Sequence, residues 1–244
     1  MPFFRLRQQL IYFAHVPKCA GTSVEAYLQR RFGALAFRDQ FHYRDPGPRW
    51  TVTSPQHVTA ADLERLIPVK YFAARFTVLR HPVPRLVSVF RFQRDWEQRI
   101  PPETRLSAWL EDLRAKGGAD PHAFDNHLLP MSAFVPEGTD VFRLEEGLNP
   151  VIAWLDRLQG EELAPREMPV INTHGGLMAK RGSQPAPVTV TPADREMIAE
   201  LYAEDFSRFG YDPASLPLER PRTEQPLPPK PKPRPSEPPI QETL

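Results

Sequence analysis

Cysteine is almost absent from this sequence. Cys19 is the only thiol in 244 residues, so no disulfide can form within the chain. Proteins stabilised by disulfides belong to oxidising compartments, whereas a lone cysteine fits a reducing one. The sequence therefore predicts a cytoplasmic protein, with peripheral association with a membrane as an open alternative.

Strong net charge and long apolar runs are missing as well. The 31 Lys and Arg residues nearly balance the 30 Asp and Glu residues, which leaves a formal net charge of +1. Such a balance gives no general attraction to nucleic acid, so no nucleic-acid partner is expected. Any anion site must therefore be a local basic cluster.

Long apolar runs are absent too. No apolar run reaches about eighteen residues, and the N-terminal run is too short for a signal peptide, so we expect neither a transmembrane segment nor a leader.

Proline, by contrast, is abundant and unevenly placed. Of the 32 positions in 213–244, eleven are proline. A segment of this composition cannot form regular structure or bury a core. We therefore predict a folded domain over 1–212 and a disordered, Pro-rich tail over 213–244. The tail is either a plain solvated extension or a docking site for a partner that reads PxxP.

The folded part alternates between strand-like and helix-like patterns. Strands are expected at 11–16, 51–55, 76–79 and 141–146, and helices at 22–32, 61–67, 82–96, 151–158 and 195–210. Capping boxes mark two of the helix starts, Thr59–Asp62 and Thr191–Asp194. This alternation predicts an α/β fold, a P-loop-like three-layer sandwich with a central, mainly parallel sheet and helices on both faces.

The segment HVPKCAGTS, residues 15–23, lies between the first expected strand and a helix. Ligands of α/β sheets bind beyond the carboxyl ends of strands, and helix N-termini attract anions. Lys18 would supply a positive charge, Gly21 a close approach of the backbone, and Thr22 and Ser23 hydroxyl donors. In a Walker A loop the Lys stands directly before the hydroxyl, whereas Lys18 precedes the Gly. This tighter loop favours a smaller anion than a triphosphate with Mg²⁺.

A second candidate anion element begins after the strand at 76–79. Arg80 stands at the strand end, and Ser88 follows eight residues later inside the expected helix. Eight residues make slightly over two turns, so Ser88 can face back toward Arg80 and complete a phosphate clamp. Arg85 either joins this clamp or pairs with a carboxylate. Two anion sites at two strand ends indicate a nucleoside with phosphates at both ends.

These two segments, HVPKCAGTS and TVLRHPVPRLVSVF, resemble the cofactor motifs of sulfotransferases that use 3′-phosphoadenosine 5′-phosphosulfate (PAPS). Further segments resemble the carbohydrate branch, which holds Golgi-type (family 2) enzymes and their bacterial relatives: SPQHVTAADL, DNHLLPMSAFVPEG, VFRLEEGL, PVINTHG and MIAELYAEDFSRFGY. The resemblance covers most of residues 10–212. It implies transfer of a sulfuryl group from PAPS to a hydroxyl acceptor, most often on a carbohydrate.

The resemblance also implies a role for each matching position. Residues of the first loop would hold the 5′-phosphosulfate: Lys18, Cys19, Ala20, Gly21, Thr22 and Ser23. Arg80 and Ser88 would hold the 3′-phosphate. Two residues in the INTHGGLMAKRG region, Lys180 and Arg181, are candidate phosphate or substrate contacts. The sequence departs from the family at position 81, which is His where Asp is common.

The acceptor must lose a proton, which suits a histidine because its pKa lies near neutrality. His57 falls where related enzymes place the base, and the alternative is a histidine that merely begins a helix. Lys18 would stabilise the leaving phosphate. Candidate acceptor contacts are Arg91, Arg94, Asn126 and His127, the last of these also being an alternative base or a simple loop contact. This chemistry requires no metal, and no carboxylate pair with metal-ligand spacing is present.

Two other functions remain open. A P-loop-like nucleotide kinase would need a Walker Lys and a Mg²⁺-binding Asp after a strand, and we find neither. A non-catalytic nucleotide-binding scaffold, with the Pro-rich tail recruiting partners, would be expected to have lost part of the loop or clamp. Lys18, Arg80 and Ser88 are all present, which favours the enzyme.

Overall fold

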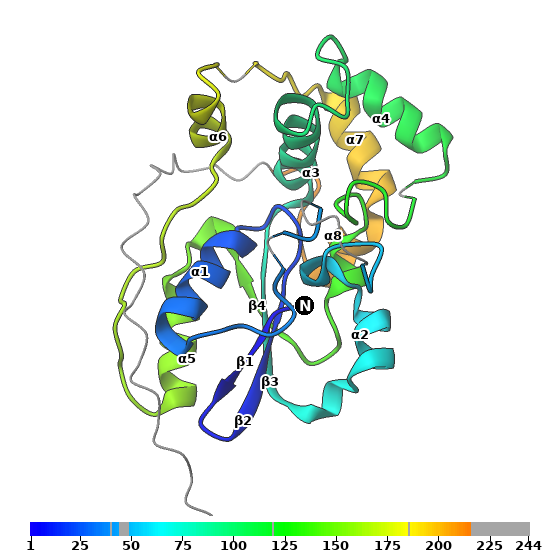
Figure 1. The fold of residues 1–244 in the computed structure, drawn as a ribbon. Coiled ribbons are helices and arrows are strands. Elements are labelled where there is room, and N and C mark those ends of the chain that lie inside the picture. Colours follow the sequence, from blue (N-terminus) through cyan, green and yellow to red (C-terminus); the bar gives the residue numbers. More distant parts are fainter. Residues whose placement is uncertain (40, 44–48, 119, 185, 216–244) are drawn as a thin grey trace, which may run out of the picture.

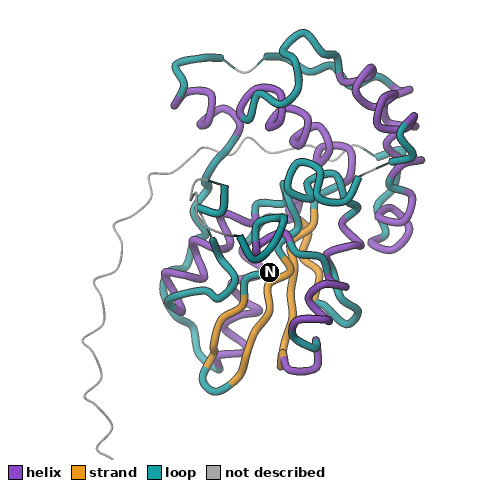
Figure 2. Tube along the Cα trace, turned by 45° about the vertical axis from the view of Figure 1, so that its right-hand side comes forward, coloured by secondary structure: helices purple, strands orange, loops and turns teal. Residues whose placement is uncertain are grey.

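The computed structural model describes residues 1–39, 41–43, 49–118, 120–184 and 186–215. At its centre is a four-stranded sheet in the order β1 (Phe3–Leu6), β2 (Gln9–Ala14), β3 (Phe72–Leu79) and β4 (Asp140–Arg143). Strands β2, β3 and β4 are parallel, and β1 pairs with β2 in the antiparallel sense (Figures 1 and 2). The prediction of an α/β fold with a mainly parallel sheet is confirmed.

The sheet register brings two candidate segments to one edge. Ala14 at the end of β2 lies opposite Thr77, and Leu79 at the end of β3 lies opposite Arg143. The Thr77 hydroxyl donates to the Ala14 carbonyl over 2.8 Å, a buried contact that locks the strand ends. The chain therefore leaves β2 and β3 at the same edge, where residues 15–23 and residue 80 follow.

Helices cover both faces of the sheet. Helices α1 (Gly21–Phe32) and α5 (Asn149–Gln159) lie on one face, where Phe13, Phe76 and Trp154 share a core with them. On the other face, Tyr12 and Ala14 pack with Leu63 of α2 (Ala60–Leu66). Each buried side chain of this size stabilises the fold by roughly 1.5–3 kcal/mol relative to an exposed one. Because successive side chains of a strand point to opposite faces, this stabilisation acts on both faces of the sheet.

A second helical layer lies beyond the carboxyl edge of the sheet (Figure 1). It consists of α3 (Pro82–Arg91), α4 (Leu106–Ala115), α7 (Pro192–Leu201) and α8 (Ala203–Phe209), which share one large core. Helix α6 (His174–Lys180) contacts the π-helical turn η3 (Phe92–Trp96) that extends α3. The remaining short turns are η1 (Pro55–His57), η2 (Val69–Tyr71), η4 (Met131–Phe134) and η5 (Leu144–Glu146).

The two capping boxes have different outcomes. At α7, the Thr191 side chain accepts from the Asp194 amide while the Asp194 carboxylate accepts from the Thr191 amide, as predicted. At α2, the Thr59 hydroxyl accepts from the Asp62 amide but donates to the Asp62 carboxylate over 2.8 Å. Only the start of α7 is therefore a complete capping box.

Several element predictions were wrong or incomplete. Residues 51–55 form no strand, because the Ser54 amide donates to the carboxylate of Asp125 rather than to a neighbouring strand. The long helix at 195–210 breaks at Tyr202, whose hydroxyl donates to the Leu128 carbonyl. Edge strand β1 and helices α4 and α6 were not anticipated. The predicted tail falls mostly outside the described residues.

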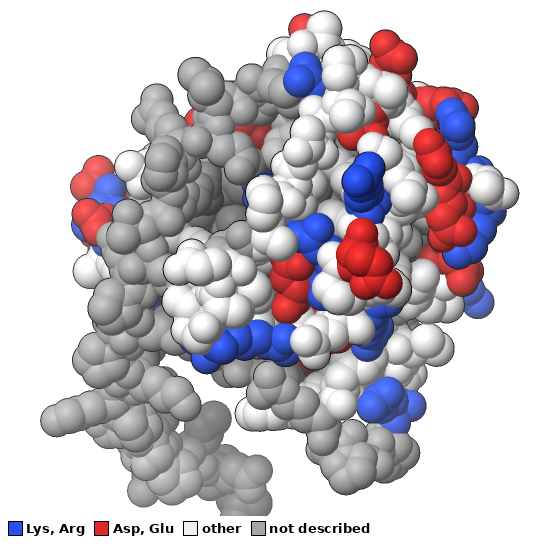
Figure 3. Space-filling model, turned by 90° about the horizontal axis from the view of Figure 1, so that it is seen from above, with Lys and Arg blue, Asp and Glu red and all other residues white. Residues whose placement is uncertain are grey.

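In the view from above, basic and acidic side chains of the described residues intermingle (Figure 3). This agrees with the balanced composition. Among the described residues, no helix combines the length and the apolar character needed to cross a membrane.

Candidate active site

The loop between β2 and α1 is built around two residues in the left-handed region. Lys18 and Ala20 both have φ of 65°. The carbonyl of Ala20, the N-cap, accepts from the amides of Ser23 and Val24 at 3.0 and 3.2 Å. Gly21 therefore begins the helix, and its amide and that of Thr22 stand at the open helix end, where an anion is favoured.

Gly21 is required for a reason that the sequence did not show. A Cβ atom at this position would lie 1.9 Å from Nε2 of His15. That ring is fixed from its other side, because Nδ1 of His15 lies 2.6 Å from Oε1 of Glu25, whose Oε2 accepts from Arg38 over 2.9 Å. His15 therefore packs directly under the loop.

Buried charge in this support is balanced locally. Burial alone would raise the pKa of Glu25, but His15 and Arg38 outweigh it and lower the pKa to about 2. Burial lowers the pKa of His15 in spite of Glu25. The carboxylate thus stays ionised, and it fixes the imidazole through a short charge-assisted hydrogen bond.

Ser23 joins the loop to a distant segment. Its hydroxyl oxygen is buried and accepts from the Ile171 amide over 3.2 Å. The hydroxyl proton is still available for donation. The segment that leads into α6 is thereby held beside the first turn of α1.

The positive charges of Lys18 and Arg80 lie in one cluster. Burial, followed by the charge of Arg80, lowers the pKa of Lys18 to about 7. The Lys18 ammonium lies 3.8 Å from the centroid of the Phe92 ring, in a cation–π contact. Burial raises the pKa of the neighbouring Cys19 thiol to about 12, although Arg80 and another arginine oppose the shift, so this thiol is unsuited to nucleophilic chemistry. Ser88 lies partly exposed on α3.

Arg85 connects the loop to a second segment rather than joining the clamp. Its side chain is buried, and it donates to the carbonyls of Pro17, His127 and Leu129 at 3.2, 3.1 and 2.8 Å. The guanidinium thus donates to backbone carbonyls of both segments. We call residues 15–23 the donor loop, after the ligand that the sequence predicts for it. The Arg85 guanidinium therefore sets the distance between the donor loop and residues 127–129.

His57 and Asp125 form a hydrogen-bonded pair. Nδ1 of His57, at the end of η1, lies 2.7 Å from Oδ2 of Asp125. Three further donors bind this carboxylate: the Ser54 amide at 2.6 Å, the Ser54 hydroxyl at 2.7 Å and the Tyr43 hydroxyl at 2.8 Å. Burial would raise the pKa of Asp125, but the charge of His57 and its hydrogen bond outweigh it and hold the pKa below its usual range. The pair leaves Nε2 of His57 as the atom able to take a proton.

A chain of aromatic contacts connects this pair to the donor loop on two sides. The His57 ring lies edge-on to His15 at 4.9 Å and to His127 at 5.0 Å between centroids. His127 in turn lies 5.6 Å from Phe92, over which the Lys18 ammonium sits. Burial lowers the pKa of His127 well below its ordinary value, so this ring stays neutral. The imidazole of His57 is therefore in contact with His15, which belongs to the loop, and with His127, which does not.

The sulfotransferase family model matches residues 1–212. The chain belongs to the sulfotransferase family. No curated protein and no solved structure gave a match. The family match confirms the resemblance found in the sequence, including its carbohydrate-sulfotransferase branch, and supports sulfuryl transfer as the general activity.

In this sulfotransferase, three groups of the site also have the composition of a cation site. His57, Asp125 and His127 each offer a ligand atom, and these atoms lie within 4.8 Å of one another. Both oxygens of Asp125 already accept hydrogen bonds, two at Oδ1 and two at Oδ2. A carboxylate satisfied in this way fits an orienting role for a base better than it fits a metal ligand.

Of the other residues predicted for the site of this sulfotransferase, two are buried and three lie at least partly on the surface. Asn126 is buried, and its amide donates to the His57 carbonyl over 2.9 Å, so it helps to hold the backbone of His57 in place. Arg94 is buried in an ion pair with Asp95 at 2.6 Å. Arg181 is exposed at the end of α6, with its guanidinium 4.5 Å from the Trp96 ring centroid. Lys180 is exposed beside it, and Arg91 is partly buried at the end of α3.

No local signal in the sequence connects Asp125 with His57, or Ser54 and Tyr43 with Asp125. Asp125 stands 68 positions after His57, so no local spacing connects them. His81 also has its own explanation: Nδ1 accepts from the Val83 amide at 3.2 Å and Nε2 lies 3.1 Å from the Asp212 carbonyl, which makes it a helix cap.

Proposed function

We propose that the protein transfers the sulfuryl group of PAPS to a hydroxyl of a carbohydrate acceptor, within a P-loop-like site and without a metal. The observation that carries this proposal is the continuous contact between the Lys18 loop and the His57–Asp125 pair. It joins an anion-binding helix start to an oriented base. Family membership supplies the general activity, and the arrangement supports the finer assignment.

The donor would lie across the carboxyl edge of the sheet. Lys18, Gly21 and Thr22 would bind the 5′-phosphosulfate, with the helix dipole behind it. Arg80 and Ser88, on the next strand and its helix, would bind the 3′-phosphate. The positive charge that depresses the pKa of Lys18 in the free protein favours an anion in the same place.

The acceptor would approach the open side of His57. Nε2 takes the proton of the acceptor hydroxyl as its oxygen attacks sulfur. The bond between sulfur and the bridging phosphate oxygen breaks, and its electron pair leaves with 3′-phosphoadenosine 5′-phosphate (PAP). Asp125 holds the imidazole in the required tautomer and stabilises the imidazolium that forms, while Lys18 faces the charge that grows on the phosphate. The protein's contribution is thus alignment and charge stabilisation, as in phosphoryl transfer.

Calorimetric titration with PAP in the absence of metal tests the donor assignment. We expect micromolar binding, about −8 kcal/mol, which weakens at least tenfold in Arg80→Ala. Arg65→Ala, an exposed arginine on α2, is the matched control and should bind as the wild type does. Failure of the wild type to bind PAP would reject the donor assignment and favour the scaffold, whereas tighter binding of ATP with Mg²⁺ than of PAP would favour the kinase.

Turnover distinguishes the enzyme from a non-catalytic scaffold. With PAPS and an accepted glycan, the wild type should release PAP, and His57→Ala should lower kcat by about 100-fold or more while PAP affinity is unchanged. A protein that binds PAP but releases none with any carbohydrate, lipid-linked sugar or small alcohol would be a scaffold.

A further inference from the structure

His81 directly follows Arg80, the proposed contact of the 3′-phosphate, yet no step of the proposed transfer uses it. The residue is buried, with 1% of its surface exposed. Its amide donates to Oε1 of Glu145 over 2.7 Å, and its carbonyl accepts from the Arg85 amide over 3.0 Å. The backbone at residue 81 is thus tied to η5 on one side and to the first turn of α3 on the other.

The His81 ring is required at the start of α3 because that start contains two prolines. Pro82 and Pro84 have no N–H, so among the first three residues of the helix only Val83 has an amide to be capped. That amide donates to Nδ1 of His81 over 3.2 Å. In the neutral ring Nε2 therefore carries the proton and donates to the Asp212 carbonyl over 3.1 Å. Burial lowers the pKa of His81, which favours this neutral form.

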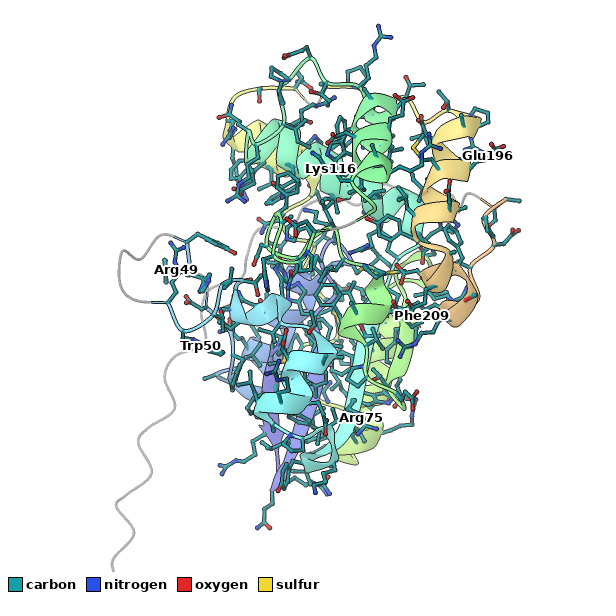
Figure 4. The ribbon with its side chains drawn as sticks, turned by 90° about the vertical axis from the view of Figure 1, so that its right-hand side faces the viewer. Arg49, Trp50, Arg75, Lys116, Glu196 and Phe209 are labelled. Carbon is teal, nitrogen blue, oxygen red and sulfur yellow. The ribbon has the colours of Figure 1, made fainter. Side chains whose placement is uncertain are left out.

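The Asp212 carbonyl belongs to a short turn that follows α8. We call residues 209–212 the α8 turn. Arg143, at the end of β4, donates to the Phe209 carbonyl over 2.7 Å, and its guanidinium lies 4.7 Å from the centroid of the Tyr211 ring. Figure 4 labels Phe209 where α8 meets the part of the molecule that contains the sheet. The Tyr211 ring lies edge-on to the His81 ring, with 5.3 Å between centroids. The α8 turn is therefore fixed to β4 and packs against the ring that it binds.

These contacts close a path around Arg80. In the sheet register Arg143 lies opposite Leu79, the residue before Arg80. The path runs from β4 through the α8 turn to His81 and returns along the chain to β3. Glu145, which follows β4 in η5, closes a second path through the His81 amide. The backbone of Arg80 therefore lies between two residues, both anchored to β4 or to the segment that follows it.

We propose that His81 is a positioning residue for donor binding, which ties the α8 turn to the start of α3 and thereby fixes the direction of Arg80. This inference rests on the proposed function, in which Arg80 binds the 3′-phosphate. His81 is no ligand of the donor, because it is buried and both ring nitrogens are hydrogen-bonded. A fixed backbone lowers the ordering cost of a long arginine side chain on binding. Loss of His81 should therefore affect recognition of the 3′-phosphate alone.

The test is calorimetric titration of the full chain with PAP and with AMP, which lacks the 3′-phosphate. The ratio of the AMP to the PAP dissociation constant measures what the 3′-phosphate contributes. The wild type should bind PAP about tenfold or more tightly than AMP. His81→Ala should lower this ratio about fivefold by weakening PAP binding, with AMP affinity within about twofold of the wild type. Arg80→Ala should lower the ratio at least as far.

Two further substitutions separate the contributions of the ring nitrogens. An Asn oxygen lies near the position of Nδ1, so His81→Asn keeps an acceptor for the Val83 amide and loses the donor to the α8 turn. A Gln amide reaches the position of Nε2, so His81→Gln keeps that donor and loses the cap. We expect His81→Gln to recover more of the PAP preference than His81→Asn. The reverse order would show that the helix cap alone positions Arg80, which would overturn the inference.

Thr191→Ala is the matched control for the loss of a helix cap. It removes the capping box of α7, so the melting temperature should fall as it does for other lost N-caps. The preference for PAP over AMP should nevertheless stay at the wild-type value. An equal loss of preference in Thr191→Ala and His81→Ala would mean that general destabilisation is the cause, and the inference would be wrong.

The remaining outcomes separate this inference from the proposed function. If Arg80→Ala loses the PAP preference but His81→Ala keeps it, the donor assignment holds and the positioning role fails. If the wild type binds PAP and AMP equally, no contact with the 3′-phosphate exists, and both the donor assignment and the positioning role fail.

Discussion

Replacement of Gly21 by alanine tests the packing that supports the donor loop. Helix propensity alone predicts that Gly21→Ala stabilises the protein by about 0.5–1 kcal/mol. The structure predicts the opposite, since the new Cβ would lie 1.9 Å from Nε2 and 2.1 Å from Cδ2 of His15. Overpacking of a core costs about 1–3 kcal/mol, and displacing the ring from Glu25 costs about 1.5–3 kcal/mol more. The net expectation is a loss of about 3 kcal/mol.

Urea denaturation measures this loss, and a melting temperature lower by about 6–12 °C should accompany it for a domain of this size. Gly175→Ala is the matched control, because a Cβ there meets nothing within 4 Å, and it should be neutral or slightly stabilising. Adding His15→Ala to Gly21→Ala should remove the clash and recover at least 1 kcal/mol relative to additivity. A Gly21→Ala protein as stable as the wild type would refute the reasoning.

Three further predictions follow from the site. Asp125→Asn should lower kcat about 10–100-fold and shift its pH profile without changing PAP affinity, because only the orientation and charge support of His57 are lost; an unchanged pH profile would remove Asp125 from the mechanism. Lys18 has a pKa of about 7 in the free protein, so PAP binding at pH 8 should take up close to one proton, measured by calorimetry in buffers of different ionisation enthalpy, and Lys18→Met should abolish the uptake; equal heats in all buffers would contradict it. Stability should fall by up to about 5 kcal/mol between pH 7.5 and 5.5. The reason is that the unfolded chain gains protons below about pH 6.5 while burial lowers the folded-state pKa of four histidines: His15, His81, His127 and His174. Equal urea midpoints at both pH values would contradict this last prediction.

The sequence was most informative where a structural element is determined by neighbouring residues in the chain. The strand–loop–helix patterns at 11–32 and 76–91 predicted the two parallel strands and the edge where they end, because periodicity and helix-start chemistry are local. The segment 51–55 was misread as a strand because Thr and Val favour extended structure, while a carboxylate from residue 125 takes the Ser54 amide instead. Tertiary contacts overrode the local preference there.

The same limit applies within the site. His57 was identified by position within a motif, but its pairing with Asp125 depends on two loops brought together by folding. Gly21 was correctly singled out, yet the ring of His15 that excludes a side chain there belongs to the preceding strand end. Residue types could be predicted from local sequence, whereas the contacts between side chains could not, because they depend on how the loops fold against one another.

The hydrogen bond between Ser23 and Ile171 has a consequence for how the protein is made. The two residues are 148 positions apart, so the donor loop leaves the ribosome well before residue 171 does. Its partner segment is synthesised only after β4 and α5. The nascent loop must therefore remain without this contact until residue 171 has been added, and closing the contact is a long-range step. A chain interrupted before residue 171 would contain every residue of the loop and yet lack the contact that holds Ser23 in place.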